Sequence, residues 1–78
     1  MKIYPVYMEG YADQGGRAPA HFVGYGSGET FVEAAKDACI QAYGEEETNR
    51  FFSDYGNRAT YWGCRLCDNY EEAARTFG

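Results

Sequence analysis

Three cysteines and one histidine are the residues of this chain with the most chemistry to offer. Cys64-Arg-Leu-Cys67 has the C-x-x-C spacing of many zinc and redox sites, and Cys39 with His21 could complete four zinc ligands. The surrounding residues alternate as in a strand, so positions 64 and 67 point to opposite faces, whereas a zinc knuckle needs a turn there. We therefore favour one core thiol and one exposed thiol, and keep a small zinc-binding protein as the least favoured interpretation.

The other catalytic patterns are incomplete. The stretch Gly24-Tyr-Gly-Ser-Gly28 lies between a strand and a helix, but it does not match G-x-G-x-x-G and no lysine follows it as in a Walker loop. His21 has only Ser27 and Ser53 as candidate nucleophiles, and a triad would need a cleft that a chain of this size can hardly build. The sequence therefore predicts a protein that is not an enzyme and has no cofactor.

Carboxylates are concentrated in the middle third of the chain. Residues 29–54 contain seven acidic residues against two basic ones, a balance of −5 that equals the net charge of the whole chain. We take the following residues as candidates for partner binding, with the last two at the margin: Glu29, Glu33, Asp37, Glu45, Glu46, Glu47, Tyr43 and Asp54. Such a row could enter a basic protein groove that normally holds a phosphate backbone. The alternative is a solvated helix face that keeps the protein soluble.

The segment before these acids predicts a hairpin followed by one main helix. Residues 2–11 and 20–26 have strand composition, and residues 12–19 have the composition of a loop. Thr30 and Glu33 have the spacing of a capping box, and Gly44 stands where a helix commonly ends, so we expect a helix over residues 31–43. Its inward stripe is rich in alanine, which would let the helix lie close to the sheet.

The segment after the main helix is less regular. Residues 45–56 could form a short second helix or a solvated loop, and residues 58–67 predict a third strand. In that strand Thr60, Trp62, Cys64 and Leu66 would face the core, and a short helix would follow Asp68 or Asn69. The expected fold is α+β, with one main helix on a three-stranded antiparallel-type sheet in the order β-β-α-(α)-β-α, forming a single domain over residues 1–78.

Composition excludes several classes of function. An acidic chain lacks the basic footprint that direct binding to nucleic acid or to an anionic membrane requires. No apolar run approaches the roughly 20 residues of a membrane span, and Met1-Lys2 leads into strand-like sequence with no signal peptide. An odd number of cysteines without a secretory signal indicates reduced thiols, so we expect a cytoplasmic protein.

Eight tyrosines are many for 78 residues. On the sheet face opposite the main helix we expect Tyr61 and Arg65, with Tyr7, Tyr11 and Tyr25 as further candidates. A second function is therefore open, a structural or assembly role in which this face binds a partner or a second copy of the chain as a homodimer.

In length, acidity, short α+β layout and lack of an enzyme motif, the chain resembles the small acidic proteins of phages and mobile elements, anti-CRISPR proteins among them. The resemblance implies a stoichiometric inhibitor in the cytoplasm of a host bacterium. Such a protein would bind a CRISPR effector and exclude its target DNA, with carboxylates in place of phosphates.

Overall fold

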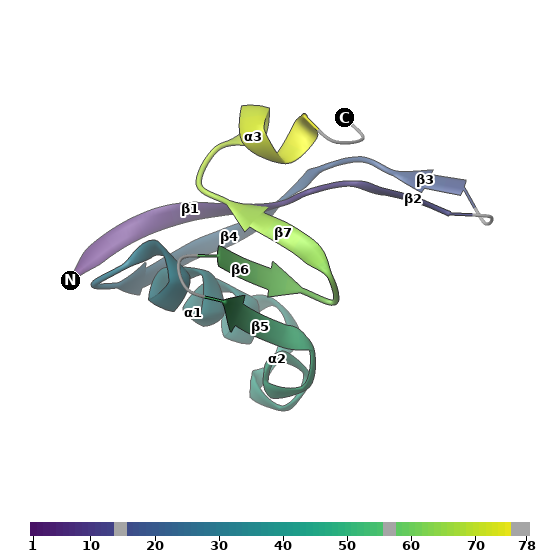
Figure 1. Ribbon diagram of the computed structural model, residues 1–78. Coiled ribbons are helices and arrows are strands. Elements are labelled where there is room, and N and C mark those ends of the chain that lie inside the picture. The colour runs from purple at the N-terminus through teal and green to yellow at the C-terminus, as the bar shows by residue number, and fades with distance from the viewer. Residues whose placement is uncertain (14–15, 56–57, 76–78) are drawn as a thin grey trace.

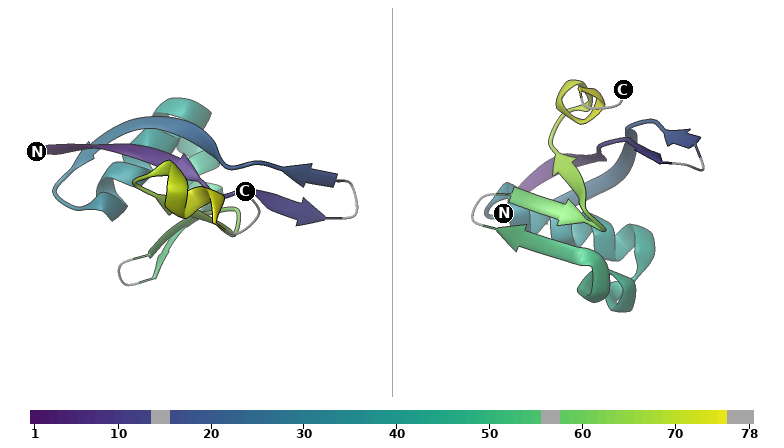
Figure 2. Two further views of the ribbon diagram at one scale, coloured as in Figure 1. Left: turned by 90° about the horizontal axis from the view of Figure 1, so that it is seen from above. Right: turned by 45° about the vertical axis from the view of Figure 1, so that its right-hand side comes forward.

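The computed structural model of the chain describes residues 1–13, 16–55 and 58–75. In these residues the elements labelled in Figure 1 are β1 Lys2–Met8, β2 Tyr11–Asp13, β3 Gly16–Ala18, β4 His21–Gly28, α1 Phe31–Tyr43, α2 Glu45–Phe51, β5 Phe52–Tyr55, β6 Arg58–Tyr61, β7 Cys64–Cys67 and α3 Tyr70–Ala74. Figures 1 and 2 show α1 on one face of the sheet, α3 on the other, and β2 with β3 projecting from the body.

Five strands form one antiparallel sheet in the order β4-β1-β7-β6-β5, and β2 pairs with β3 in a separate ribbon. The α+β class agrees with the expectation, but the expected three-stranded sheet is wrong. The expected loop over 12–19 contains most of the ribbon, β5 follows α2 directly, and the expected third strand is the hairpin of β6 and β7. These strands have three or four residues each, too few to show the alternation by which a strand is recognised in a sequence.

Strand β1 lies inside the sheet although it contains a proline. It pairs with β4 along its whole length, from Lys2 to Met8, but with β7 only at Tyr7 and Met8. Pro5 faces Tyr25, whose carbonyl accepts a hydrogen bond from Gln41 and so points away from β1. The missing N–H of Pro5 therefore lies on the side away from β4, where β7 does not pair with it, and interrupts no ladder. Strand β4 forms the edge of the sheet beside it.

Helix α1 has the predicted bounds and lies very close to β4. Thr30 Oγ1 accepts a hydrogen bond from the Glu33 amide, at 3.3 Å, and caps the helix. Glu33 Oε1 in turn accepts from the amide of Glu29, at 2.9 Å, one residue further back than in an ordinary capping box. A Cβ on Gly26 would overlap the backbone carbonyl of Ala34, so glycine on the strand and alanine on the helix together permit this contact.

Of the two interpretations of residues 45–56, the helical one is confirmed, since α2 runs from Glu45 to Phe51 and β5 follows it. Gly44 joins α1 to α2 with a φ of +94°, a conformation in which glycine is favoured. The C-terminal helix is confirmed as well. Asn69 caps α3 by accepting a hydrogen bond from the amide of Glu72 at 2.7 Å.

The hairpin of β6 and β7 turns on two residues, Trp62 and Gly63. Both have positive φ, +53° and +79°, as in a type I′ turn, and Trp62 is the only non-glycine residue with positive φ in the part of the chain that the structure describes. The turn divides the expected strand in two, so the alternation of inward and outward side chains is interrupted at Trp62. Ala59 and Tyr61 face the core, whereas Trp62 lies in solvent with 74% of its surface exposed. The expectation that Trp62 would face the core is therefore wrong, as is that of Tyr61 on the outer face.

The main core lies between the sheet and α1. It contains Val6, Met8, Ala35, Ala38, Cys39, Ala59, Tyr61 and Leu66. A smaller cluster of Ala20, Cys67 and Ala73 lies under α3. In the described residues, no helix is both long enough and apolar enough to cross a membrane.

Candidate functional site

Three adjacent carboxylates, those of Glu45, Glu46 and Glu47, form the first turn of α2, and all three residues are exposed. Negative charge is favourable there, because the amino end of a helix carries unpaired N–H groups and a partial positive charge. Glu47 lies 3.9 Å from Arg50 one turn later, but both side chains are about half exposed or more, so this ion pair contributes little to stability. The three carboxylates therefore remain accessible to a partner.

The carboxylate of Asp37, by contrast, already accepts hydrogen bonds from other residues of the protein. Its Oδ2 accepts hydrogen bonds from the amide of Ser27 at 2.9 Å, from the Ser27 hydroxyl at 3.3 Å and from Gln41 Nε2 at 3.0 Å. Gln41 also donates to the carbonyl of Tyr25 at 3.3 Å. Because β4 is an edge strand, these bonds cover backbone groups that would otherwise be open to another strand. Asp37 thus has a structural role at the edge of the sheet.

The remaining acidic candidates lie apart from α2's first turn. Glu29 is 3.8 Å from the amino group of Met1, with both side chains more than 70% exposed. Glu33 and Asp54 both line a small pocket of about 200 Å³, which Lys36 also lines. Helix α1 rises about 1.5 Å per residue, so its 13 residues put roughly 18 Å between Glu29 and the first turn of α2. The candidate residues therefore form separate groups and not one continuous row.

A larger hollow, an aromatic groove of about 630 Å³, lies beside α2. It is lined by Met8, Tyr11, Tyr43, Glu47, Phe51, Tyr61, Trp62 and Cys64, which come from β1, β2, α1, α2 and the β6–β7 hairpin. We call this site the aromatic groove. Of the residues proposed from the sequence, it brings together Tyr43 and Glu47.

Stacked rings build the walls of the aromatic groove. Phe51 and Trp62 are nearly parallel, with centroids 4.9 Å apart and planes at 18°, and Tyr43 stacks on Tyr61 at 4.7 Å and 29°. The amide of Trp62 donates to the carbonyl of Phe51 at 2.9 Å, which fixes the turn to the end of α2. Trp62, Tyr11 and Tyr43 are all exposed, so these ring surfaces are open to a ligand.

Glu47 supplies the formal charge of the aromatic groove, as the only Asp, Glu, Lys or Arg among the described residues that line it. Burial, and then the charge of Glu47, raise the pKa of the Tyr61 hydroxyl. Burial also raises the pKa of Tyr43 and of Cys64. These three groups therefore stay neutral at physiological pH, and the groove is apolar with one negative rim.

The opposite face of the sheet carries a second row of aromatic rings. Tyr70 lies 6.1 Å from Tyr7, Tyr7 lies 5.1 Å from Phe22, and Phe22 lies 5.2 Å from Tyr25, measured between ring centroids. Of the tyrosines considered for this face, Tyr7 and Tyr25 belong to this row, whereas Tyr61 is in the core and Tyr11 lines the aromatic groove.

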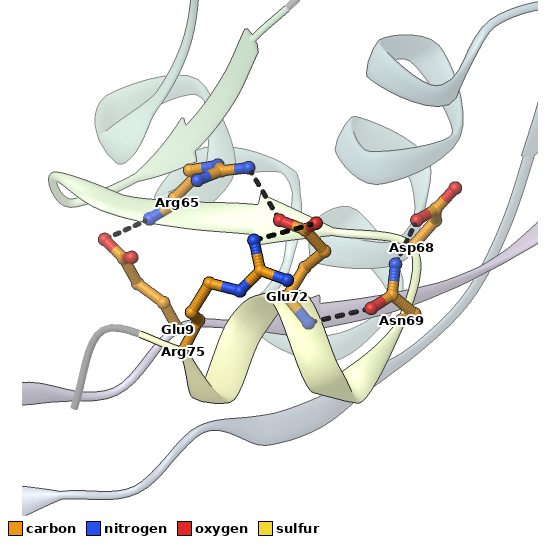
Figure 3. A network of polar contacts seen from close by, with 6 residues as sticks. All are labelled: Glu9, Arg65, Asp68, Asn69, Glu72 and Arg75. Atoms are coloured by element: carbon orange, nitrogen blue, oxygen red, sulfur yellow. Dashed lines mark hydrogen bonds and ion pairs between the residues drawn. The ribbon is translucent and has the colours of Figure 1, made fainter. Parts of the chain in front are cut away.

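A polar network links α3 to the sheet, and in it Arg65 and Arg75 each form an ion pair with Glu72 (Figure 3). Glu72 lies 3.2 Å from Arg65 and 3.7 Å from Arg75, and Glu9 accepts a hydrogen bond from the Arg65 amide at 3.0 Å. Asn69 donates to Asp68 at 2.8 Å and accepts from Glu72. Glu72 is therefore paired with two arginines, in contrast to the carboxylates of α2, of which only Glu47 has an ion pair with an arginine of the described ranges.

The cysteines lie in three different surroundings. Cys39 is in the main core and Cys67 in the small cluster under α3, while Cys64 is half-buried at the aromatic groove. Burial raises the pKa of Cys39 to about 11, so this thiol stays protonated. In the described part of the chain no three His, Cys, Asp or Glu residues lie together in a way that could hold a metal ion.

Neither a scan against protein-family models nor searches of curated proteins and of solved structures found a match for this chain. Its function therefore has to be argued from the site itself.

Sequence reasoning missed the aromatic groove because its walls come from five distant segments. One signal was present. In Tyr61-Trp-Gly-Cys64 a glycine stands between two short β-like runs, which is the pattern of a two-residue hairpin turn. A turn at this place directs the side chain of Trp62 outward.

Proposed function

We propose that this chain is a non-enzymatic binding protein whose partner presents a basic groove. Its most specific form is the anti-CRISPR-type inhibitor that the sequence resembles, in which carboxylates occupy the nucleic-acid-binding site of a CRISPR effector. The observation that carries the proposal is the first turn of α2, where Glu45, Glu46 and Glu47 are exposed beside the aromatic groove. Accessible carboxylates attract a basic partner and steer its approach.

The geometry changes the set of contacts that we propose. Glu45, Glu46 and Glu47 become the main contacts, with Tyr43 beside them at the aromatic groove. Three more distant residues, Glu29, Glu33 and Asp54, would contact only a partner that extends along α1 and β5. Asp37 is left out of the set, because its carboxylate already accepts three hydrogen bonds.

Charge reversal at one position of α2 tests this proposal, with a matched control on α3. Glu46 and Glu71 are both exposed, and each is the second residue of its short helix. We expect Glu46→Lys to weaken association with a basic partner by about fivefold or more at low salt, because it replaces an attraction by a repulsion. Glu71→Lys makes the same change of net charge and should have a much smaller effect.

The partner is sought by adding the protein to purified CRISPR effector complexes and measuring their binding to target DNA. Inhibition that weakens with salt and with Glu46→Lys supports the anti-CRISPR form. If no effector complex loses DNA binding, that form is excluded. If, in addition, no basic protein shows binding that weakens with salt, the proposal of a partner with a basic groove is excluded too.

A second candidate function rests on the aromatic row of the opposite sheet face, where Phe22, Tyr25 and Tyr70 are all exposed. Exposed rings on a sheet face can bind a partner or a second copy of the chain. Association through this face would be insensitive to salt, unlike association through α2, so the two functions are separated by the same measurement.

A further inference from the structure

We propose that the aromatic groove is a binding site for an arginine side chain of the protein partner, with Glu47 as its counter-ion. The inference rests on the proposed function, since it names the chemistry by which a basic partner would be anchored.

The aromatic groove combines two kinds of group that attract a cation. Trp62, Tyr11 and Tyr43 are exposed aromatic residues, and the side chain of Glu47 at their margin is half exposed. A cation is attracted by the face of an aromatic ring and by a carboxylate, so a groove whose described lining contains both, and no lysine or arginine, favours a positively charged occupant. An apolar occupant would leave Glu47 without a partner from the ligand.

The guanidinium of Arg50 already contacts one ring and the carboxylate of this groove. The Cζ atom of Arg50 lies 5.7 Å from the centroid of the Phe51 ring, and its Nη1 lies 3.9 Å from Glu47 Oε1. Arg50 is not among the residues that line the groove, and its side chain is 68% exposed, so it leaves the groove open. Its position nevertheless shows that this ring and this carboxylate can contact one guanidinium together.

The flat ring surfaces of the groove favour arginine over lysine as the occupant. The ring pairs of the groove are nearly parallel stacks, 18° for Phe51 with Trp62 and 29° for Tyr43 with Tyr61. A planar guanidinium stacks on such flat faces while its edge donates to a carboxylate, whereas an ammonium group is compact and more strongly hydrated. A volume of about 630 Å³ leaves room for the side chain together with part of the backbone that carries it.

Trp62 has a backbone conformation that is unusual for a residue with a side chain. A non-glycine residue with a φ of +53° is strained, and the surrounding structure must offset the stability that this strain costs. Strained residues of this kind cluster at binding sites. Here the strained residue is also a tryptophan with 74% of its surface in solvent. Its stack on Phe51 offsets part of this strain, and the large area that stays exposed is available for a ligand to stack on.

The test uses the full-length protein and three peptides that differ at one position. Acetylated and amidated Gly-Gly-Arg-Gly-Gly is titrated at low salt, alongside the same peptide with lysine or with norleucine in place of arginine. Amide chemical shifts and the indole N–H of Trp62, the only tryptophan, report the binding. We expect the arginine peptide to bind at the groove more tightly than the lysine peptide, and the norleucine peptide to bind weakest.

Variants make the assignment specific. Glu47→Gln should lower the affinity for the arginine peptide by about fivefold, which is the upper range for an exposed ion pair. It should leave the affinity for the norleucine peptide unchanged. Trp62→Asn should weaken it by a similar factor, because one ring face is lost while the turn is kept. Arg50→Ala should strengthen binding about twofold, since it frees Glu47 from its internal partner, and a loss of folding cannot produce that result. Glu71→Gln on α3 is the control for net charge.

Equal binding of norleucine and arginine, or an unchanged affinity in Glu47→Gln, would overturn this inference and leave the proposed function intact. Lysine binding as tight as arginine would overturn the assignment to a guanidinium. If arginine binds at the groove as expected but no basic protein associates with the chain, the arginine site is supported and the proposed function is what fails.

Discussion

Cys39 connects the protonation of one buried thiol to the stability of the whole fold. It is fully buried in the main core, and burial raises its pKa from 9.0 to about 11. The unfolded chain loses this proton near pH 9, whereas the folded chain keeps it until about pH 11. The stability that the neutral thiol contributes is therefore complete below pH 9 and is lost as the pH rises to 11.

We expect this loss to approach about 2–3 kcal/mol above pH 11, at about 1.4 kcal/mol for each unit of difference. Urea unfolding between pH 8 and 11, under reducing conditions, measures it. Cys39→Ala should be less stable at pH 8 because of the cavity, but its stability should fall less steeply with pH. Equal slopes for the two proteins would contradict this account. The pKa values of Cys64 and Cys67 are also raised, but without a contribution from Cys39, so these groups cancel in the comparison. Burial is the main cause of the raised pKa of Tyr43 and of Tyr61, and Cys39 adds to both, so its replacement also reduces their part of the slope.

Trp62 separates stability from binding at a single position. Trp62→Asn creates Asn-Gly, the preferred sequence for a type I′ turn, and relieves about 1 kcal/mol or more of backbone strain. It also removes the ring stacked on Phe51, a contact worth about 0.5–1.5 kcal/mol. Since the two effects are opposite and similar in size, we expect the free energy of unfolding to change by less than about 1 kcal/mol. Thermal unfolding checks this, and a large destabilisation would mean that Trp62 is a structural residue.

At the scale of elements, the edge of β4 is the point that most needs protection. Three glycines lie in this strand, and no lysine or proline, so it lacks the residues that usually discourage pairing with another chain. The outward amide of Ser27 and carbonyl of Tyr25 are instead covered from α1, by Asp37 and Gln41. The same bonds attach α1 to the strand that it covers.

We expect Asp37→Ala to destabilise the protein by about 1–3 kcal/mol, because hydrogen bonds to a charged group are lost. It should also promote association through the exposed strand edge. Chemical denaturation measures the first effect and light scattering the second. Glu33→Ala is a suitable comparison on the same helix, since Glu33 accepts only one bond from the exposed amide of Glu29. Equal effects of the two substitutions would argue against a special role for the edge contact.

For the whole molecule, the oligomeric state follows from the area of the aromatic row. A stable interface buries about 800 Å² on each partner. Phe22, Tyr25 and Tyr70 are 46%, 62% and 49% exposed. At about 200 Å² for each fully exposed aromatic residue, the three together offer roughly 300 Å² of surface to an interface. This area is too small for a stable dimer on its own.

We therefore expect a monomer at micromolar concentration. Light scattering over a range of protein concentrations and two salt concentrations measures it directly. A dimer that persists at low concentration and is insensitive to salt would favour the assembly function over the acidic one.

Several features of this protein were determined by local sequence. Helix α1 begins at Phe31 after the cap of Thr30 and ends before Gly44, and α3 follows the cap of Asn69, because caps and glycines act within a few residues. The opposite orientation of Cys64 and Cys67 also followed from alternation within one strand. The expectation of one core and one exposed thiol is wrong, because Cys67 is buried in the cluster with Ala73 of α3 and Cys64 is half-buried. The net charge and its concentration in residues 29–54 are properties of composition alone.

Only the tertiary structure decided which of those charges are accessible and where the aromatic rings meet. Asp37 and Glu46 look alike in the sequence, yet one is bonded to the edge of β4 and the other is free at the first turn of α2. Tyr11, Tyr43 and Trp62 are far apart in the chain and line one groove. Pairings between distant segments depend on strand order and on turns, and short strands carry too little pattern to reveal either. For that reason the acidic segment could be predicted, whereas the aromatic groove beside it could not.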